Sequence, residues 1–170
     1  MSVARCLFLS VLLLAGFTRP TFPQEEQKAC CEAVDFQAFD AEGVSIQLLE
    51  VKRTGPDDVT ATWKYVNSSE APQQLTKGGA GPAWAAYRLC WDAELRDDAS
   101  GTGYPVARNE KTQAPMAAKH EPASASKGLW IGPGKTLKTW AKFPVPAEVS
   151  KVTVTLPGAS QPWEDVAITP

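Results

Sequence analysis

The sequence predicts an all-β protein folded as an antiparallel β-sandwich of about seven to nine strands. Apolar residues alternate with polar ones in several short segments, as they do in strands that bury one face. Turn-forming residues separate these segments, among them 12 Gly and 14 Pro, and no stretch of ten residues has a convincing helical pattern. Because a sheet with one dry face must cover that face, a second sheet is expected to pack against the first.

Residues 1–20 are predicted to be a secretory signal peptide. A positive charge precedes an apolar core, residues 6–17, which is too short to span a bilayer, and a polar segment with two prolines follows at once. We expect cleavage near Thr18. Residues 21–43 then form a polar lead-in, and residues 44–170 form the sandwich domain. The mature chain is expected to be secreted or periplasmic and to contain no transmembrane segment.

The first part of the domain contains two long strands and a short one. In residues 44–53 apolar and polar residues alternate, but the apolar positions change from even to odd numbers after Leu48. This shift indicates a bulge near Leu48–Leu49. Residues 59–65 alternate without interruption and predict a second strand, which ends at the triplet Asn67-Ser68-Ser69. That triplet also has the sequence of a glycosylation acceptor, but we interpret it as a turn. A short strand is expected at residues 73–76.

The longest alternation runs from residue 85 to residue 95. It predicts a strand with Leu89 and Trp91 on its inner face and Cys90 on its outer face. A hairpin-like turn at residues 97–103 should lead to another strand at residues 104–107.

The rest of the domain is predicted to be a loop followed by short strands. Residues 109–127 are poor in large apolar residues and rich in Ala, Lys, Ser and Pro, so we expect a long exposed loop. Strands are expected at residues 129–131, 137–143, 152–156 and 165–168.

The cysteines predict a disulfide bond in the exported protein. Cys6 is removed with the signal peptide, which leaves Cys30, Cys31 and Cys90. Adjacent cysteines rarely bond to each other, so Cys90 is predicted to pair with Cys30 or Cys31. Free thiols are an alternative. A zinc site made of these three cysteines and His120 is nominally available, but no C-x-x-C spacing is present, and we expect no metal and no cofactor.

Two segments resemble a known family. They are Val-Thr-Ala-Thr-Trp-Lys-Tyr-Val-Asn at residues 59–67, and residues 135–168, which contain Phe-Pro-Val-Pro and Val-Thr-Val-Thr-Leu-Pro-Gly. Both are similar to a family of bacterial extracellular immunoglobulin-like domains of unknown function, whose members occur alone after a signal peptide or attached to outer-membrane peptidoglycan-anchoring domains. The resemblance covers residues 44–168. It implies an immunoglobulin-like sandwich outside the cytoplasm and implies no activity; the chain departs from the family at Cys30–Cys31 and at residues 109–127.

Composition argues against two classes of function. The chain has 17 Lys and Arg against 19 Asp and Glu, a net charge of −2, so binding of nucleic acid through a basic surface is not expected. It has one histidine and no strained nucleophile motif around any serine, so we do not expect an enzyme. The expected function is a secreted, non-catalytic binding or envelope-associated module with an unknown protein or glycan partner of the cell envelope.

Tryptophan is the one residue type in excess, with six in the chain. Trp63 and Trp91 are predicted to lie in the core. Trp140 shares its side of a strand with Lys138 and Lys142, and an exposed ring flanked by cations can bind a protein or stack on a sugar. A loop or the lead-in could equally cover this ring. The alternative function is therefore a carbohydrate-binding accessory domain that uses Trp140, together with Trp130 and Trp163.

Overall fold

The computed structural model describes residues 36–38, 40–76, 85–121 and 128–170. The predicted signal peptide and most of the lead-in, including Cys30 and Cys31, lie outside the described residues. Within the described part, the regular structure consists of ten strands and one 3₁₀ turn, η1 (Ala85–Tyr87). Eight strands have three residues or more and two have only two residues.

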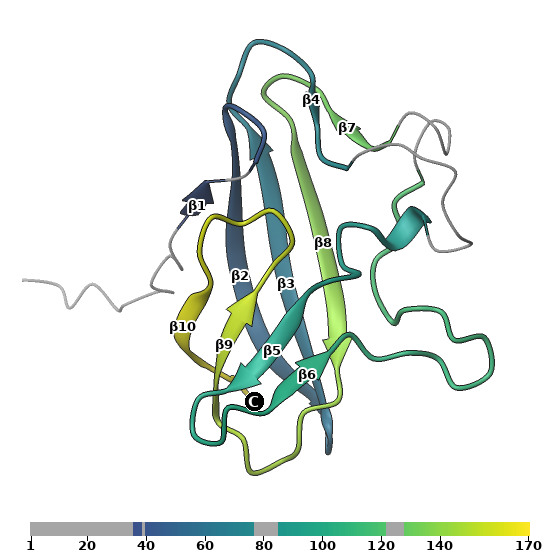
Figure 1. The fold of residues 1–170 in the computed structure, drawn as a ribbon, viewed down its shortest axis with the longest axis vertical. Coiled ribbons are helices and arrows are strands. Elements are labelled where there is room, and N and C mark those ends of the chain that lie inside the picture. The colour runs from purple at the N-terminus through teal and green to yellow at the C-terminus, as the bar shows by residue number, and fades with distance from the viewer. Residues whose placement is uncertain (1–35, 39, 77–84, 122–127) are drawn as a thin grey trace, which may run out of the picture. The chain divides into compact units, whose positions relative to one another are not determined.

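The strands form two four-stranded sheets and one small ribbon (Figure 1). The first sheet has the order β1 (Phe36–Ala38), β2 (Val44–Gly55), β3 (Asp58–Asn67), β8 (Thr136–Phe143). The second has the order β10 (Trp163–Ala167), β9 (Lys151–Thr155), β5 (Glu94–Asp97), β6 (Gly103–Pro105). The ribbon pairs β4 (Gln73–Gln74) with β7 (Trp130–Ile131). Every strand pair is antiparallel, which confirms the predicted all-β sandwich.

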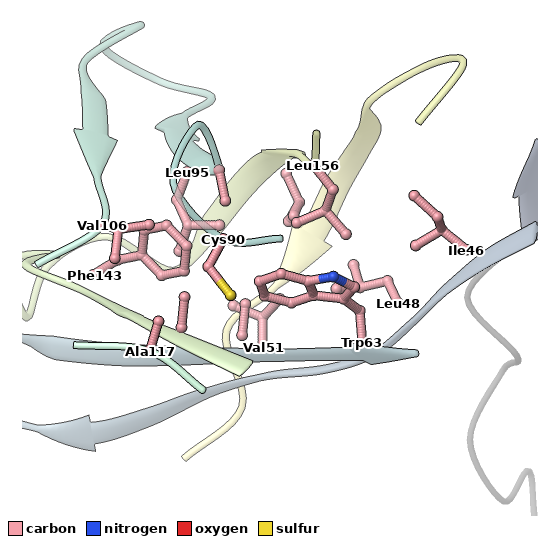
Figure 2. Close-up of a cluster of buried hydrophobic side chains, with 14 of the residues drawn as sticks. Ile46, Leu48, Val51, Trp63, Cys90, Leu95, Val106, Ala117, Phe143 and Leu156 are labelled. Carbon is pink, nitrogen blue, oxygen red and sulfur yellow. The ribbon is translucent and has the colours of Figure 1, made fainter. Parts of the chain in front are cut away.

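The core lies where the apolar sides of the two large sheets meet. Trp63 and Phe143 from the first sheet and Leu95 from the second are fully buried, as the alternation predicts. Figure 2 shows part of this cluster, with Trp63 and Cys90 pointing into it. Burying one side chain of this size stabilises a fold by about 1.5–3 kcal/mol, so the shared interior accounts for the stacking of the sheets.

Most predicted strands are present within two residues of their expected bounds. The bulge near Leu48–Leu49 is confirmed as a register shift between Leu48 and Glu50 in the pairing of β2 with β3. The last strand begins at Trp163 rather than at residue 165, and its pairing with β9 shifts between Trp163 and Val166. Asp165 has a φ of 55° inside this irregularity, so the alternation of the strand is broken there and obscured its true start.

The predicted strand at residues 85–95 is wrong. This segment forms η1 and a series of tight turns, with the Cys90 amide bonded to the Tyr87 carbonyl and the Ala93 amide to the Cys90 carbonyl; β5 begins only at Glu94. The turns bring Leu89, Cys90 and Ala93 into the core. Cys90 is therefore fully buried rather than outward, and Trp91 is half-buried rather than in the core.

The predicted loop at residues 109–127 is only partly a free loop. Its first part, residues 109–113, is exposed, but the segment that follows lies along the edge of β8. The Ala118 amide donates to the Trp140 carbonyl, the Lys142 amide donates to the Met116 carbonyl, and Ala117 lies opposite Ala141. An edge strand needs partners for its backbone groups, and the small Ala117 lets this segment come close enough to supply them. Residues 122–127 lie outside the described residues.

Candidate functional site: the exposed face of the first sheet

The outer side of β2, β3 and β8 is built from residues that alternate with the core. In the pairing of β3 with β8, Trp140 lies opposite Thr62, Lys138 opposite Lys64, and Lys142 opposite Thr60. The next strand, β2, continues these three rows with Glu50, Gln47 and Lys52, in the same order. The edge segment adds Met116 beside Lys142 and Ala118 beside Trp140. We call this surface the Trp140 face; it consists of Gln47, Glu50, Lys52, Thr60, Thr62, Lys64, Met116, Ala118, Lys138, Trp140 and Lys142.

The indole of Trp140 is accessible because its neighbours are small. Its side chain is 42% exposed. Ala118 lies on one side of it and Thr62 on the other, and Thr62 is itself nearly buried, with its hydroxyl 3.4 Å from a Glu50 carboxylate oxygen. Among the described residues, two of the three large apolar side chains that are exposed, Trp140 and Met116, lie on this face.

The charge of the Trp140 face is predominantly positive. Four lysines lie on it, at positions 52, 64, 138 and 142, against the carboxylates of Glu50 and of Asp58 at the start of β3. Lys142 forms an ion pair with Asp58 at 3.3 Å. Lys138 and Lys64 lie directly opposite each other on adjacent strands. Like charges in this position destabilise a sheet, so an anion that bound between them would be favoured.

The structure brings together three of the four predicted surface residues. Trp140, Lys138 and Lys142 share the Trp140 face as expected. Trp130 is 53% exposed but belongs to β7, which pairs with β4 in the separate ribbon. Trp163 is 5% exposed, so its predicted place in a stacking platform is wrong: the side chain completes the core against β9.

Lys64 and Met116 are members of the face that the sequence analysis missed. Lys64 has the outward parity of its strand, but its position opposite Lys138 depends on the register between two strands that are more than 70 residues apart in the chain. Met116 lies in the segment that was expected to be a loop. The position of each residue on the Trp140 face follows only from its pairing with β8, which is distant in sequence from Lys64 and was not predicted for the segment of Met116.

His120 and Cys90 are joined through one threonine. The hydroxyl of Thr139, a buried residue of β8, lies 3.0 Å from His120 Nε2 and 3.4 Å from Cys90 Sγ. Burial raises the pKa of the Cys90 thiol to about 11, partly opposed by the hydrogen bond to Thr139, and burial lowers the pKa of His120. A thiol protonated at neutral pH is a poor nucleophile and a poor metal ligand, so we interpret this chain of contacts as structural.

The described residues contain no group of three His, Cys, Asp or Glu side chains that could hold a metal ion. Cys90 is a free thiol in the structure. Its predicted disulfide stays a prediction, because Cys30 and Cys31 lie outside the described residues. Within the same part of the chain, no helix has the length and apolar character that crossing a membrane requires.

Comparisons with known proteins identify no relative of this chain. No family model, no curated protein and no solved structure matches this chain.

Proposed function

We propose that this protein is an exported, non-catalytic binding module of the immunoglobulin-like kind that it resembles, and that it binds an anionic partner of the cell envelope through the Trp140 face. The observation that carries the proposal is the exposed indole of Trp140 next to the opposed pair Lys138 and Lys64. An aromatic ring contributes contact area and orientation, and the lysines contribute attraction to negative charge.

An acidic glycan is the finer candidate for this partner. The cross-strand neighbours of Trp140 are the small side chains of Ala118 and Thr62, so a sugar ring can approach the face of the indole. Uronic acid carboxylates on the same polymer would reach the lysines on either side. A protein with an acidic patch is the competing partner, because Trp is also the residue type most enriched at the centre of protein interfaces.

Affinity electrophoresis of the mature chain tests this proposal. Migration should be retarded in gels that contain an acidic polysaccharide such as polygalacturonate, and much less in gels that contain a neutral one. Trp140→Ala and the double variant Lys64→Gln/Lys138→Gln should each weaken retardation at least about fivefold, and added salt should weaken it further. Trp130→Ala and Lys111→Gln, which remove an indole and a charge elsewhere, are the matched controls.

Each outcome has a defined meaning. Retardation that depends on Trp140 and on the lysines supports an acidic glycan. If no polysaccharide retards the chain but an envelope extract yields a protein whose capture Trp140→Ala abolishes, the partner is a protein and the glycan assignment is wrong. If the control variants weaken binding as much as the face variants do, the Trp140 face is not the site.

A further inference from the structure

A second, concave feature lies away from the Trp140 face. It is a pocket of about 380 Å³ between the segment that follows β6, the returning edge segment and the residue after β8. It is lined by three prolines, an indole, two aliphatic residues and one arginine: Pro105, Pro115, Pro144, Trp91, Val106, Ala107 and Arg108. Arg108 and Pro115 are bridge partners. Since side chains alternate along the edge segment, both lie on the side opposite Met116 and Trp140.

The walls of this pocket offer apolar contact and rigidity. A proline side chain is a closed ring with no hydrogen-bond donor, and its backbone is restricted in φ. Three such rings and one indole can therefore contact the apolar body of a ligand with little loss of conformational entropy. The volume is within the range of small-molecule sites, at the lower end.

Arg108 is held in place for recognition of an anion. The centre of its guanidinium lies 4.7 Å from the centroid of the Trp91 ring, a cation–π contact. A cation–π contact uses no hydrogen-bond donor, so the five N–H groups of the guanidinium can still donate to an acceptor. One of these groups lies 3.5 Å from the Gln113 carbonyl oxygen. Among the residues that the structure describes, the four ion pairs involve other side chains, and none includes Arg108.

We propose that this pocket binds a small carboxylate with an apolar body, which forms a bidentate ion pair with Arg108 while its ring or alkyl group packs against Trp91 and the prolines. One guanidinium matches the single charge and the planar geometry of a carboxylate. A phosphate dianion would call for more than one cation, and the pocket walls contribute only Arg108. The ligand can be a free organic acid or the terminal carboxylate of a polypeptide that ends in an apolar residue.

The experiment titrates the full mature chain with three probes. N-acetylphenylalanine represents a polypeptide C-terminus, phenylacetate represents a free acid, and N-acetylphenylalaninamide has the same apolar body without the charge. The readout is the indole N–H resonance of Trp91 in ¹H–¹⁵N spectra, assigned by its loss in Trp91→Phe. We expect at least one acid to bind with a Kd of about 1 mM, and the amide to bind at least tenfold more weakly.

Arg108→Gln should weaken binding of the acid at least about tenfold. Arg108 is exposed, so the variant should fold, and an unchanged thermal midpoint verifies this. Arg96→Gln is the matched control, because Arg96 is an exposed arginine of β5 that pairs with Glu94. Binding of N-acetylphenylalanine alone points to a polypeptide C-terminus, and binding of phenylacetate points to a free acid; either result supports the proposal.

Three results would overturn it. The first is the absence of any shift of the Trp91 resonance up to about 10 mM of either acid. The second is equal affinity for the acid and the amide, and the third is equal affinity in Arg108→Gln and the wild type. None of these measurements involves Trp140 or the lysines of the Trp140 face. A negative result for the Arg108 pocket therefore does not contradict the proposed function of the Trp140 face, and the reverse also holds.

Discussion

Arg53 holds the turn between β8 and β9 by hydrogen bonds to backbone carbonyls. Its guanidinium donates to the carbonyl oxygens of Val145 at 2.9 Å, Pro146 at 3.1 Å and Val149 at 2.8 Å. Val145 and Val149 are buried, and the two prolines of this Phe-Pro-Val-Pro turn remove backbone donors that could otherwise pair. One forked side chain thus bonds three carbonyls of the turn, and that of Pro146 also accepts from the Val149 amide at 3.2 Å.

Arg53→Ala is expected to lower the free energy of unfolding by about 2 kcal/mol, because charged hydrogen bonds to three carbonyls are lost while partial exposure lets water replace some of them. Arg53→Lys should recover little of this loss, since an ammonium group cannot span the three acceptors as a planar fork does. Urea denaturation checks both variants. Arg96→Ala, which removes an exposed arginine with one surface partner, should change the stability by less than about 0.5 kcal/mol; an equal loss in both variants would contradict the role of Arg53.

Asn67 is a buried connector rather than a glycosylation site. Its side chain is fully buried, and its Nδ2 donates to the carbonyls of Ala71, Ile131 and Gly132, while its Oδ1 accepts from Ser69. The amide therefore ties the end of β3 to the segment around β7. The interpretation of Asn67-Ser68-Ser69 as a turn is consistent with these contacts.

Asn67→Asp is expected to destabilise the protein by about 3 kcal/mol or more, because a buried carboxylate would face three carbonyl oxygens in place of a donor. Asn109→Asp provides a matched control. There Oδ1 only accepts, from the amides of Lys111 and Thr112, and a carboxylate can do the same. Thermal unfolding of the two variants compares them directly; similar midpoints would show that the donors of Asn67 contribute little.

At the scale of elements, the segment from Ala114 to His120 extends the first sheet. It pairs with β8 through Met116 and Ala118, and its end is anchored by the His120 amide on the Ala86 carbonyl. The His120 ring then contacts Thr139 from the inner side of β8. The segment thereby covers the backbone groups along part of this edge, and it carries Met116 onto the Trp140 face.

The protonation state of His120 should make this element sensitive to acid. Burial lowers its pKa in the folded state below the ordinary value of 6.5, so the unfolded chain binds the proton more readily. The stability from neutral His120 is thus fully present above about pH 6.5 and falls as the pH drops below it. The slope cannot exceed about 1.4 kcal/mol per pH unit, and the partial exposure of the ring reduces it.

His120→Gln should flatten the dependence of stability on pH between about pH 7 and pH 5, because glutamine does not titrate and can still bond to Thr139. Denaturation with urea at several pH values measures this. Asp97, whose pKa is lowered mainly by the Ser100 hydroxyl and then by the Ala99 amide, contributes only at more acidic pH. An identical slope in the wild type and in His120→Gln would show that the acid sensitivity comes from other groups.

Local alternation in the sequence predicted some of the elements and not others. Strands such as β3 and β8 were predicted because apolar residues recur at every second position along much of each strand, with Thr139 as an exception in β8, and the lysines on either side of Trp140 follow from the same alternation. Residues 85–93 alternate as well, yet their buried positions, Ala86, Leu89, Cys90 and Ala93, do not recur at every second residue, so they fit a series of turns and not a strand. The edge segment and the Lys64–Lys138 pair depend on contacts distant in sequence, which local patterns do not encode.

At the scale of the whole molecule, Cys90 reports on the closure of the two sheets. Its side chain lies in the cluster formed by both sheets and the turn segment, and it is fully buried (Figure 2). A reagent can reach it only if the sandwich opens. The raised pKa of about 11 further suppresses the thiolate, which is the reactive form.

In a Cys30→Ser/Cys31→Ser variant, Cys90 should react with a thiol reagent at pH 8 far more slowly in the native state than in the denatured state. The urea concentration at which it becomes reactive should coincide with the midpoint followed by tryptophan fluorescence, because one cooperative unit protects both probes. Adding Ser100→Cys to this variant places a thiol on an exposed turn and serves as the control for reagent access. Fast reaction of Cys90 below the unfolding transition would mean that the sheets separate locally and that the core is not a single unit.

The same chemistry tests the predicted disulfide in a chain that begins after the predicted signal peptide and keeps Cys30, Cys31 and Cys90. A bond from Cys90 to Cys30 or Cys31 predicts one thiol per denatured chain without reductant and three after reduction. Because Cys90 is buried between the sheets, such a bond also requires the lead-in to reach into the core, and it would link the segment before β1 to the turns before β5. Three thiols without reductant would instead leave Cys90 free, as in the structure, so that its burial rests on packing and on its contacts with the Thr139 hydroxyl and the Trp140 carbonyl.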